Sequence, residues 1–258
     1  MLALVGASAA GPRLQSDDLH AQSAATVWAR DFGSADLSYM ALNEQGQVVA
    51  QRWENADRPV SVGSLVKPFI AMAYARDHDA FPEYRCTGKT TCWLPRGHGK
   101  LGMSNAIALS CNSYFHQLAA HSPGIAGTLQ KQFAITLALD GHSGSMAPLA
   151  LAYAYLQLAA HNNDKAAGAV LSGMRLSASR GTGKAAGAVL PTSALAKTGT
   201  APCTHRKKAP GDGFAVVMSP ADHPRMVLLV RLHGRPGAAA AGVAGRMMAA
   251  VEGHGTAQ

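Results

Sequence analysis

The residues best suited to chemistry form a Ser-x-x-Lys motif, in which Ser64 stands three positions before Lys67. Positions i and i+3 share one face of a helix, so a helix here would set the lysine amine beside the serine hydroxyl. A serine hydroxyl is a weak nucleophile that needs a neighbouring base. Lysine supplies that base when burial, nearby cations or the positive end of a helix lower its pKa. The motif predicts a nucleophilic Ser64 activated by Lys67.

A Ser-Cys-Asn motif follows later in the chain. Its serine, Ser110, is suited to pass a proton between Lys67 and a leaving amine. Its amide, Asn112, lies two residues further on and is suited to hydrogen-bond a substrate amide. These roles predict a second element that faces the Ser64 hydroxyl.

A third motif, Lys-Thr-Gly-Thr, has the composition of a strand that binds an extended peptide. Its glycine, Gly199, permits close approach of another backbone. Its other side chains offer a charge and two hydroxyls to a terminal carboxylate, and they are Lys197, Thr198 and Thr200. The backbone N–H groups of Ser64 and Thr200 are predicted to form an oxyanion hole. Each motif alone is weak evidence, but all three in this order favour acyl transfer through a serine.

The elements that must hold these motifs are strands at the two chain ends and helices between them. Residues 37–42 and 47–53 read as a hairpin around a turn, because strand-like residues flank Asn-Glu-Gln-Gly. Two more strands are expected at 213–219 and 226–233, before an alanine-rich closing helix at 237–252. Helices are expected at 64–77, 103–120, 148–161 and 166–174. The pattern predicts an α+β fold whose sheet is built from both ends, with an inserted helical region.

Composition limits the class of protein. A chain of 258 residues with 48% hydrophobic and 15% charged residues is globular and suits one domain, expected at 21–258. The net charge of +8 suits an anionic partner. The basic residues are scattered without a nucleic-acid-binding motif, so no nucleic-acid partner is expected. No apolar run is long enough to span a membrane. Residues 1–20 are expected to be either an export signal or a disordered N-terminus.

With these motifs, the chain resembles the transpeptidase domain of class B penicillin-binding proteins, the elongation type most of all. The likeness covers roughly residues 37–233. It includes the segments at 97–99, 108–115, 147–152 and 181–186, where the last looks like the family's Gly-Thr-Gly-x-x-Ala element. The family fold is a five-stranded antiparallel sheet with an inserted helical region, a β-lactamase/transpeptidase-like architecture. The family's usual membrane anchor and N-terminal pedestal are not recognised in this sequence.

The resemblance implies an acyl-serine D,D-transpeptidase or D,D-carboxypeptidase that acts on D-Ala-D-Ala peptidoglycan stem peptides and is acylated by β-lactam antibiotics. The place of action would be extracytoplasmic, on the periplasmic or cell-wall side of the membrane. Cell-wall synthesis proteins are the expected partners. A serine β-lactamase and a non-catalytic β-lactam sensor or scaffold remain alternatives. A class A β-lactamase base is missing, because no glutamate lies between Cys111 and Ala196.

The cysteines and one histidine form a further candidate site. Cys86, Cys92, His98 and Cys111 follow the pattern C-x5-C-x5-H-x12-C, a complete tetrahedral ligand set for zinc with a spacing unlike a standard finger. Some elongation-type penicillin-binding proteins carry a zinc site near the active serine, and the resemblance implies that these residues match its ligands. The zinc would be structural, and no organic cofactor is expected. A Cys86–Cys92 disulfide is the alternative for an exported chain.

Overall fold

The computed structural model describes residues 16–203 and 209–252. Its centre is a five-stranded antiparallel sheet in the order β2-β1-β10-β9-β8. The strands are β1 (Leu37–Asn43), β2 (Val48–Arg52), β8 (Leu195–Ala201), β9 (Asp212–Ser219) and β10 (Met226–Leu232). The two ends of the chain therefore build one sheet, which confirms the predicted α+β fold.

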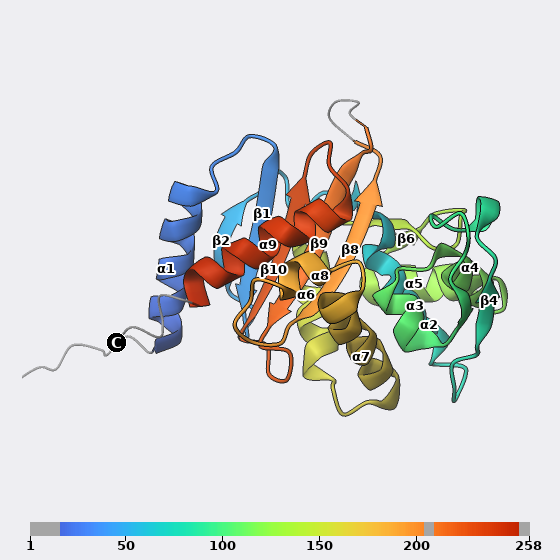
Figure 1. Ribbon diagram of the computed structural model, residues 1–258. Coiled ribbons are helices and arrows are strands. Elements are labelled where there is room, and N and C mark those ends of the chain that lie inside the picture. Colours follow the sequence, from blue (N-terminus) through green and yellow to red (C-terminus); the bar gives the residue numbers. More distant parts are fainter. Residues whose placement is uncertain (1–15, 204–208, 253–258) are drawn as a thin grey trace, which may run out of the picture.

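Helices cover both faces of this sheet (Figure 1). One face carries α1 (Ser16–Asp31), α8 (Lys184–Gly187) and α9 (Gly237–Glu252), and the other carries α6 (Pro148–Ala160). Side chains alternate along each strand, so a strand contributes residues to the cores on both faces of the sheet. Along β9, Ala215 and Val217 belong to the core under α9, whereas Val216 and Met218 belong to the core on the opposite face.

A helical lobe lies beside β8, mostly to the right of the sheet in Figure 1, with α7 (Lys165–Arg180) drawn lower, below α8. Its other helices are η1 (Gly63–Val66), α2 (Lys67–Tyr74), η2 (Lys89–Thr91), α3 (Met103–Ala108), α4 (Asn112–Ala120) and α5 (Ile125–Phe133). Two small sheets complete the molecule. Their strands are β3 (Val60–Ser61), β6 (Thr136–Leu137) and β7 (Gly144–Met146) in one, and β4 (Tyr84–Cys86) and β5 (Gly99–Leu101) in the other.

The sequence-based helix limits need correction in the helical lobe. The helix predicted at 103–120 is wrong as a single element, because the chain breaks between α3 and α4 at the Ser-Cys-Asn motif. The backbone φ angle of Ser110 is 49° there, which a continuous helix does not allow. The helix predicted at 64–77 starts as the 3-10 turn η1, and α7 runs beyond the predicted 166–174. Neither α1 nor α5 was predicted.

The predicted N-terminal segment, residues 1–20, falls largely outside the described residues, and helix α1 begins at Ser16. Its assignment as an export signal or disordered segment stays a prediction, as does the single domain at 21–258. Across residues 16–203 and 209–252, no helix has the length and apolar character that crossing a membrane requires.

Candidate active site

The first and third motifs meet where strand β8 runs against the turn η1. Two glycines permit this approach. A Cβ atom on Gly63, whose φ angle is 55°, would collide with the backbone of Thr200. A Cβ atom on Gly199 would lie 2.6 Å from the carbonyl oxygen of Val62. The close packing places the backbone of Ser64, which follows Gly63, beside the Lys-Thr-Gly strand.

Lys67 opens helix α2 and is fully buried. Its Nζ donates hydrogen bonds to the carbonyl oxygen of Ser110 at 2.8 Å and to Asn112 Oδ1 at 2.6 Å. Burial lowers the pKa of Lys67 to about 7, against the opposing effect of the acidic groups of Cys111, Cys92 and Asp140. A substantial fraction of the amine is therefore neutral near pH 7, as a general base must be.

Ser110 joins the two lysines. Its hydroxyl accepts a hydrogen bond from Lys197 Nζ at 2.8 Å and lies 3.5 Å from Lys67 Nζ. Lys197 is fully buried as well, and its Nζ also donates to the carbonyl oxygen of Thr198 at 2.7 Å. Burial and the charge of Lys67 both lower the pKa of Lys197. The Ser110 hydroxyl therefore lies between the two buried lysine amines.

Ser64 lies in η1, one turn before Lys67, and is half-buried. Among the described residues, no hydrogen bond joins its hydroxyl to Lys67 Nζ, whose partners are Ser110 and Asn112. The structure therefore brings Lys67, Ser110, Asn112 and Lys197 into direct contact and leaves the Ser64 hydroxyl outside that network. Hydrogen bonds to a catalytic base are often long or absent before substrate binds, so this geometry is compatible with attack by Ser64.

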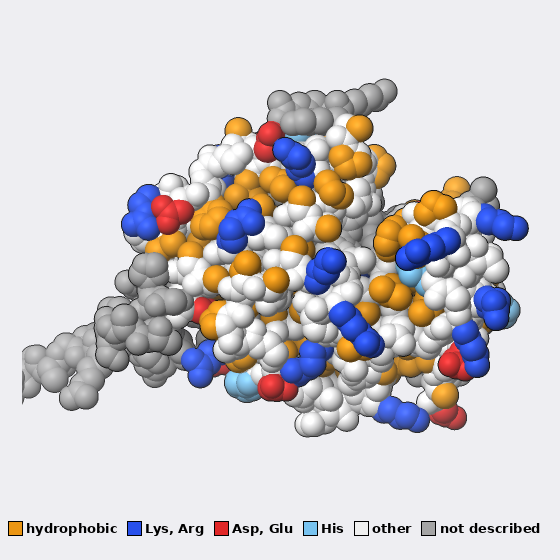
Figure 2. All heavy atoms as spheres, viewed as in Figure 1, with side chains coloured by type: hydrophobic (Ala, Val, Ile, Leu, Met, Phe, Trp, Pro, Cys, Tyr) orange, Lys and Arg blue, Asp and Glu red, His pale blue; other side chains and the backbone are white. Residues whose placement is uncertain are grey.

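Strand β8 forms one edge of the five-stranded sheet, so a second chain has room to pair with it. Thr200 is exposed on this strand. Thr198 is buried and donates its hydroxyl to Thr182 Oγ1 at 2.6 Å. The surface is hollowed between the sheet and the helical lobe, alongside β8 (Figure 2). This hollow is the natural place for an extended peptide.

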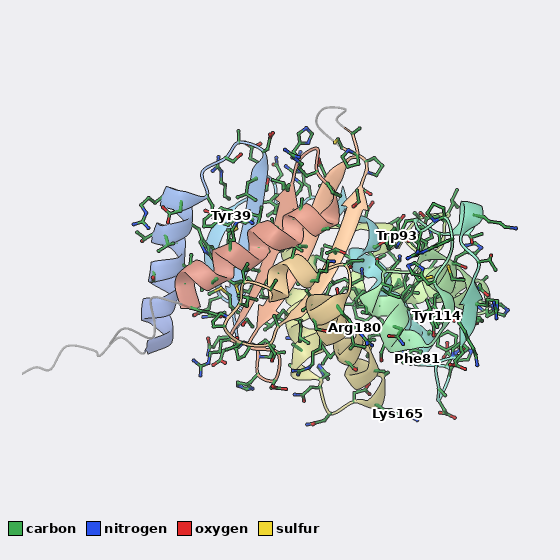
Figure 3. The ribbon with its side chains drawn as sticks, in the orientation of Figure 1. Tyr39, Phe81, Trp93, Tyr114, Lys165 and Arg180 are labelled. Carbon is green, nitrogen blue, oxygen red and sulfur yellow. The ribbon has the colours of Figure 1, made fainter. Side chains whose placement is uncertain are left out.

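The sequence analysis missed an aromatic side chain beside the site. Trp93 is 53% exposed, and its Nε1 donates to the carbonyl oxygens of Leu109 and Ser110, both at 3.2 Å. It lies on the side of the helical lobe that faces β8 (Figure 3). The feature of the sequence that could have indicated Trp93 is its position between two predicted metal ligands, Cys92 and His98. An exposed ring at this position offers a stacking surface to a ligand.

The predicted metal ligands converge in the same lobe. The ligand atoms of Cys86, Cys92, His98 and Cys111 all lie within 4.8 Å of one another. His98 Nδ1 lies 3.6 Å from Cys86 Sγ and 3.4 Å from Cys92 Sγ, and the sulfurs of Cys92 and Cys111 are 3.9 Å apart. Tetrahedral zinc, with bonds of about 2.3 Å to sulfur and 2.0–2.1 Å to nitrogen, spaces its ligands by about 3.5–3.8 Å. These residues therefore fit zinc in both geometry and chemistry.

Cys86, Cys92 and Cys111 are buried free thiols. Burial and the neighbouring thiols raise the pKa of Cys111 above its ordinary value. For Cys92, burial raises the pKa, but hydrogen bonds from nearby backbone groups and Cys86 outweigh it and lower the pKa overall. Like charges in one buried pocket oppose each other, so three thiolates can coexist there only beside a cation.

One family model matches the C-terminal part of the chain. The family model described as the penicillin binding protein transpeptidase domain matches residues 157–251, which include the Lys-Thr-Gly strand. Ser64 and Ser110 lie outside the matched part. A search of curated proteins finds no match.

Solved structures match nearly the whole chain. The transpeptidase domain of penicillin-binding protein 3 from Burkholderia pseudomallei matches with a TM-score of 0.69 and 18% identity, over 94% of this chain and 96% of that one. The transpeptidase domain of the D,D-transpeptidase FtsI4 from Legionella pneumophila gives 0.63 and 20%, over 93% and 97%. PBP2 from Helicobacter pylori, in a complex with MreC, gives 0.72 and 13%, over 90% and 62%. These likenesses show the fold.

The match to the transpeptidase family model covers the third motif and the strands that follow it. The shared fold extends over more than nine-tenths of the chain and so includes the elements that carry the other two motifs. Residues 157–251 therefore resemble the penicillin binding protein transpeptidase domain, and the chain as a whole shares the fold of such domains.

Proposed function

We propose that the chain is an acyl-serine D,D-transpeptidase or D,D-carboxypeptidase that acts on the D-Ala-D-Ala ends of peptidoglycan stem peptides. The observation that carries the proposal is the buried contact of Lys67 with Ser110 and Asn112, next to Lys197 and one turn from Ser64. A base with a pKa of about 7 and a hydroxyl that can relay a proton are parts that acyl transfer to serine uses, and a second lysine amine lies beside them at the edge strand.

The first step is attack by Ser64 on the carbonyl carbon of the penultimate D-alanine. Neutral Lys67 takes the hydroxyl proton as the Oγ–C bond forms. The carbonyl oxygen becomes an oxyanion, which the N–H groups of Ser64 and Thr200 stabilise. The C–N bond then breaks, and the proton passes from Lys67 through Ser110 to the departing D-alanine amine. An acceptor amine or water releases the acyl group from Ser64.

Substrate binding follows from the exposed edge of β8. An extended peptide adds to a free sheet edge through main-chain hydrogen bonds. Its terminal carboxylate would lie against Lys197, Thr198 and Thr200, which offer an amine and two hydroxyls, with Thr200 the exposed member of the three. Trp93 would form the opposite wall of the hollow. A β-lactam antibiotic would occupy the same place and acylate Ser64 in the same way.

Peptide turnover tests this function. The purified chain is incubated with a stem-peptide donor that ends in D-Ala-D-Ala, with and without an amine acceptor, and D-alanine release and the cross-linked product are measured. We expect release of D-alanine, and its absence for Ser64→Ala. Consumption of a β-lactam without D-alanine release would instead indicate a β-lactamase. Failure of both reactions would support a sensor or scaffold.

We infer that the sulfur and imidazole cluster holds a structural zinc ion through Cys86, Cys92, His98 and Cys111. The support is the ligand spacing and the burial of the three thiols. Bound zinc would supply the positive charge that allows the thiols to ionise. Cys111 lies between Ser110 and Asn112, so the ligands would tie the loop that carries Trp93 to the acylation site. No bond-making step uses the metal.

Replacing Cys92 by serine is expected to remove one equivalent of zinc per chain and to lower the melting temperature, because one of four ligands is lost. Metal analysis of the purified variant measures the first effect, and thermal unfolding measures the second. Ser113→Ala is the matched control, since Ser113 is a buried serine that directly follows the Ser-Cys-Asn motif and is not one of the four candidate ligands. Equal zinc content in wild type and Cys92→Ser would refute this site.

We propose an extracytoplasmic place of action, on the periplasmic or cell-wall side of the membrane, because peptidoglycan lies there. A partner from the cell-wall synthesis machinery is also proposed. Its support is the fold shared with PBP2 of Helicobacter pylori, which forms a complex with MreC.

A further inference from the structure

A second cluster of side chains that could hold a metal ion lies at the end of β8 that follows the Lys-Thr-Gly motif, outside the set of residues assigned to acylation. Cys203, Asp212 and His233 place one ligand atom each within 4.8 Å of the others. Cys203 follows β8, Asp212 begins β9, and His233 follows β10. The strand register explains the convergence, because Ala201 pairs with Asp212 and Leu232 pairs with Gly213.

The cluster is built into the protein rather than spread over its surface. Asp212 and His233 are 1% and 2% exposed, and His233 Nδ1 lies 2.6 Å from Asp212 Oδ1. The backbone N–H of His233 donates to the carbonyl oxygen of Asp36 at 2.8 Å, which fixes the start of the next turn. Cys203 is partly exposed. The cluster therefore combines a buried carboxylate and imidazole with a partly exposed thiol.

We propose that Cys203, Asp212 and His233 bind a divalent transition metal of the zinc class. A thiolate and a carboxylate balance the charge of a divalent cation, and imidazole completes a mixed sulfur, nitrogen and oxygen set. Calcium and magnesium require more oxygen ligands than this cluster offers. Three protein ligands leave a fourth tetrahedral position for water. Movements of about 1 Å in the three ligand atoms would bring their separations to those found around zinc.

The consequence concerns the strand that binds substrate. Four residues after His233, the N–H of Gly237 donates to Thr200 Oγ1 at 3.0 Å. A Cβ atom on Gly237 would collide with the backbone of Gly199, so this segment packs directly on the Lys-Thr-Gly strand. A metal at Cys203 would join the end of β8 to the segment that supports it. The site would therefore stabilise the edge strand, whether or not the acylation chemistry is as proposed.

Native mass spectrometry of the full chain under zinc titration tests the proposal. Wild type is expected to bind two zinc ions, one at each cluster. Cys203→Ser and Asp212→Asn should each lose the second ion and keep the first, whereas Cys92→Ser should lose the first and keep the second. Wild-type stoichiometry in Cys203→Ser, or a single wild-type ion that disappears in Cys92→Ser, would overturn the second site.

A measurement on wild type covers the case in which a variant does not fold. The apo chain is treated with iodoacetamide with or without zinc, and each cysteine is located by peptide mapping. A metal-bound thiolate is withdrawn from alkylation, so zinc should abolish labelling at Cys203. Labelling of Cys203 that zinc leaves unchanged would contradict the proposal, irrespective of what happens at Cys86, Cys92 and Cys111.

Discussion

Replacing Lys67 by methionine is expected to slow acylation by benzylpenicillin by about 10²–10⁴-fold, the usual contribution of a general base. Methionine fills a similar volume in this fully buried position, so the change removes the amine and keeps the packing. Stopped-flow or gel-based labelling measures the rate. Lys184→Met, on an exposed position of α8, is the matched control and should label at the wild-type rate. A wild-type rate in Lys67→Met would exclude Lys67 as the base.

The pH dependence of the same rate gives an independent check. Burial lowers the pKa of Lys67 to about 7, so the neutral base accumulates as pH rises through 7 and disappears below it. Wild-type acylation should fall about tenfold per pH unit below that value and level off above it. The slow residual rate of Lys67→Met should lack this transition. A wild-type rate that does not change between pH 5 and about 8 would contradict a titrating base near neutrality.

Removing the hydroxyl of Ser110 is expected to have the second large effect on the rate of acylation. The hydroxyl accepts from Lys197 and lies within reach of Lys67, so its loss breaks the proton path to the leaving amine. Both Ser110→Ala and Ser110→Gly should lower the rate of acylation by about 10²-fold or more. The glycine variant tolerates the observed φ angle of 49°, which alanine resists. Labelling kinetics and denaturant unfolding of both variants separate catalysis from stability.

Ser113→Ala supplies the control for this pair. Ser113 is also buried, and its hydroxyl accepts from Gln117 Nε2 at 3.2 Å, away from the lysines. Its rate of acylation should stay close to that of wild type. If Ser110→Gly labels as fast as Ser113→Ala, the proton relay assigned to Ser110 is wrong.

The sheet could be predicted because its signals are local. Alternation of side chains and turn residues gave the β1–β2 hairpin, and the same signals gave β9 and β10. The alanine-rich closing helix was also predicted, within the bounds of α9. Helix α1 was not predicted. Its position depends on long-range contacts such as the hydrogen bond from Trp28 Nε1 to the carbonyl oxygen of Met247, 219 residues away.

The break at Ser110 could not be predicted for a related reason. Neither glycine nor proline stands at 109–111, so local propensity favours one continuous helix. The observed turn presents the carbonyl oxygen of Ser110 to Lys67 and sets its hydroxyl against Lys197, contacts between residues far apart in the chain. Tertiary contacts compensate for strained backbone of this kind, which is common at functional sites.

The sequence predicts which residues belong to the candidate site better than it predicts the contacts between them. The spacing of the motifs predicted Ser64, Lys67 and Lys197 as site residues. It did not predict that Lys67 would contact Asn112 in place of Ser64. The spacing of the cysteines named the ligands of the proposed zinc ion. It did not reveal Trp93. Nor did it reveal that Cys203 lies close to Asp212 of β9 and to His233, which follows β10, because strand register brings these residues together.

Intact-protein mass spectrometry after incubation with benzylpenicillin tests the central claim, acyl transfer through Ser64, most directly. We expect wild type to gain the mass of one penicillin, with the adduct mapped to the peptide that contains Ser64 and absent from Ser64→Ala. The adduct should persist for hours if deacylation is slow. An adduct on Ser64→Ala, or no adduct on a folded wild-type chain at any pH, would contradict the assignment of Ser64 as the nucleophile.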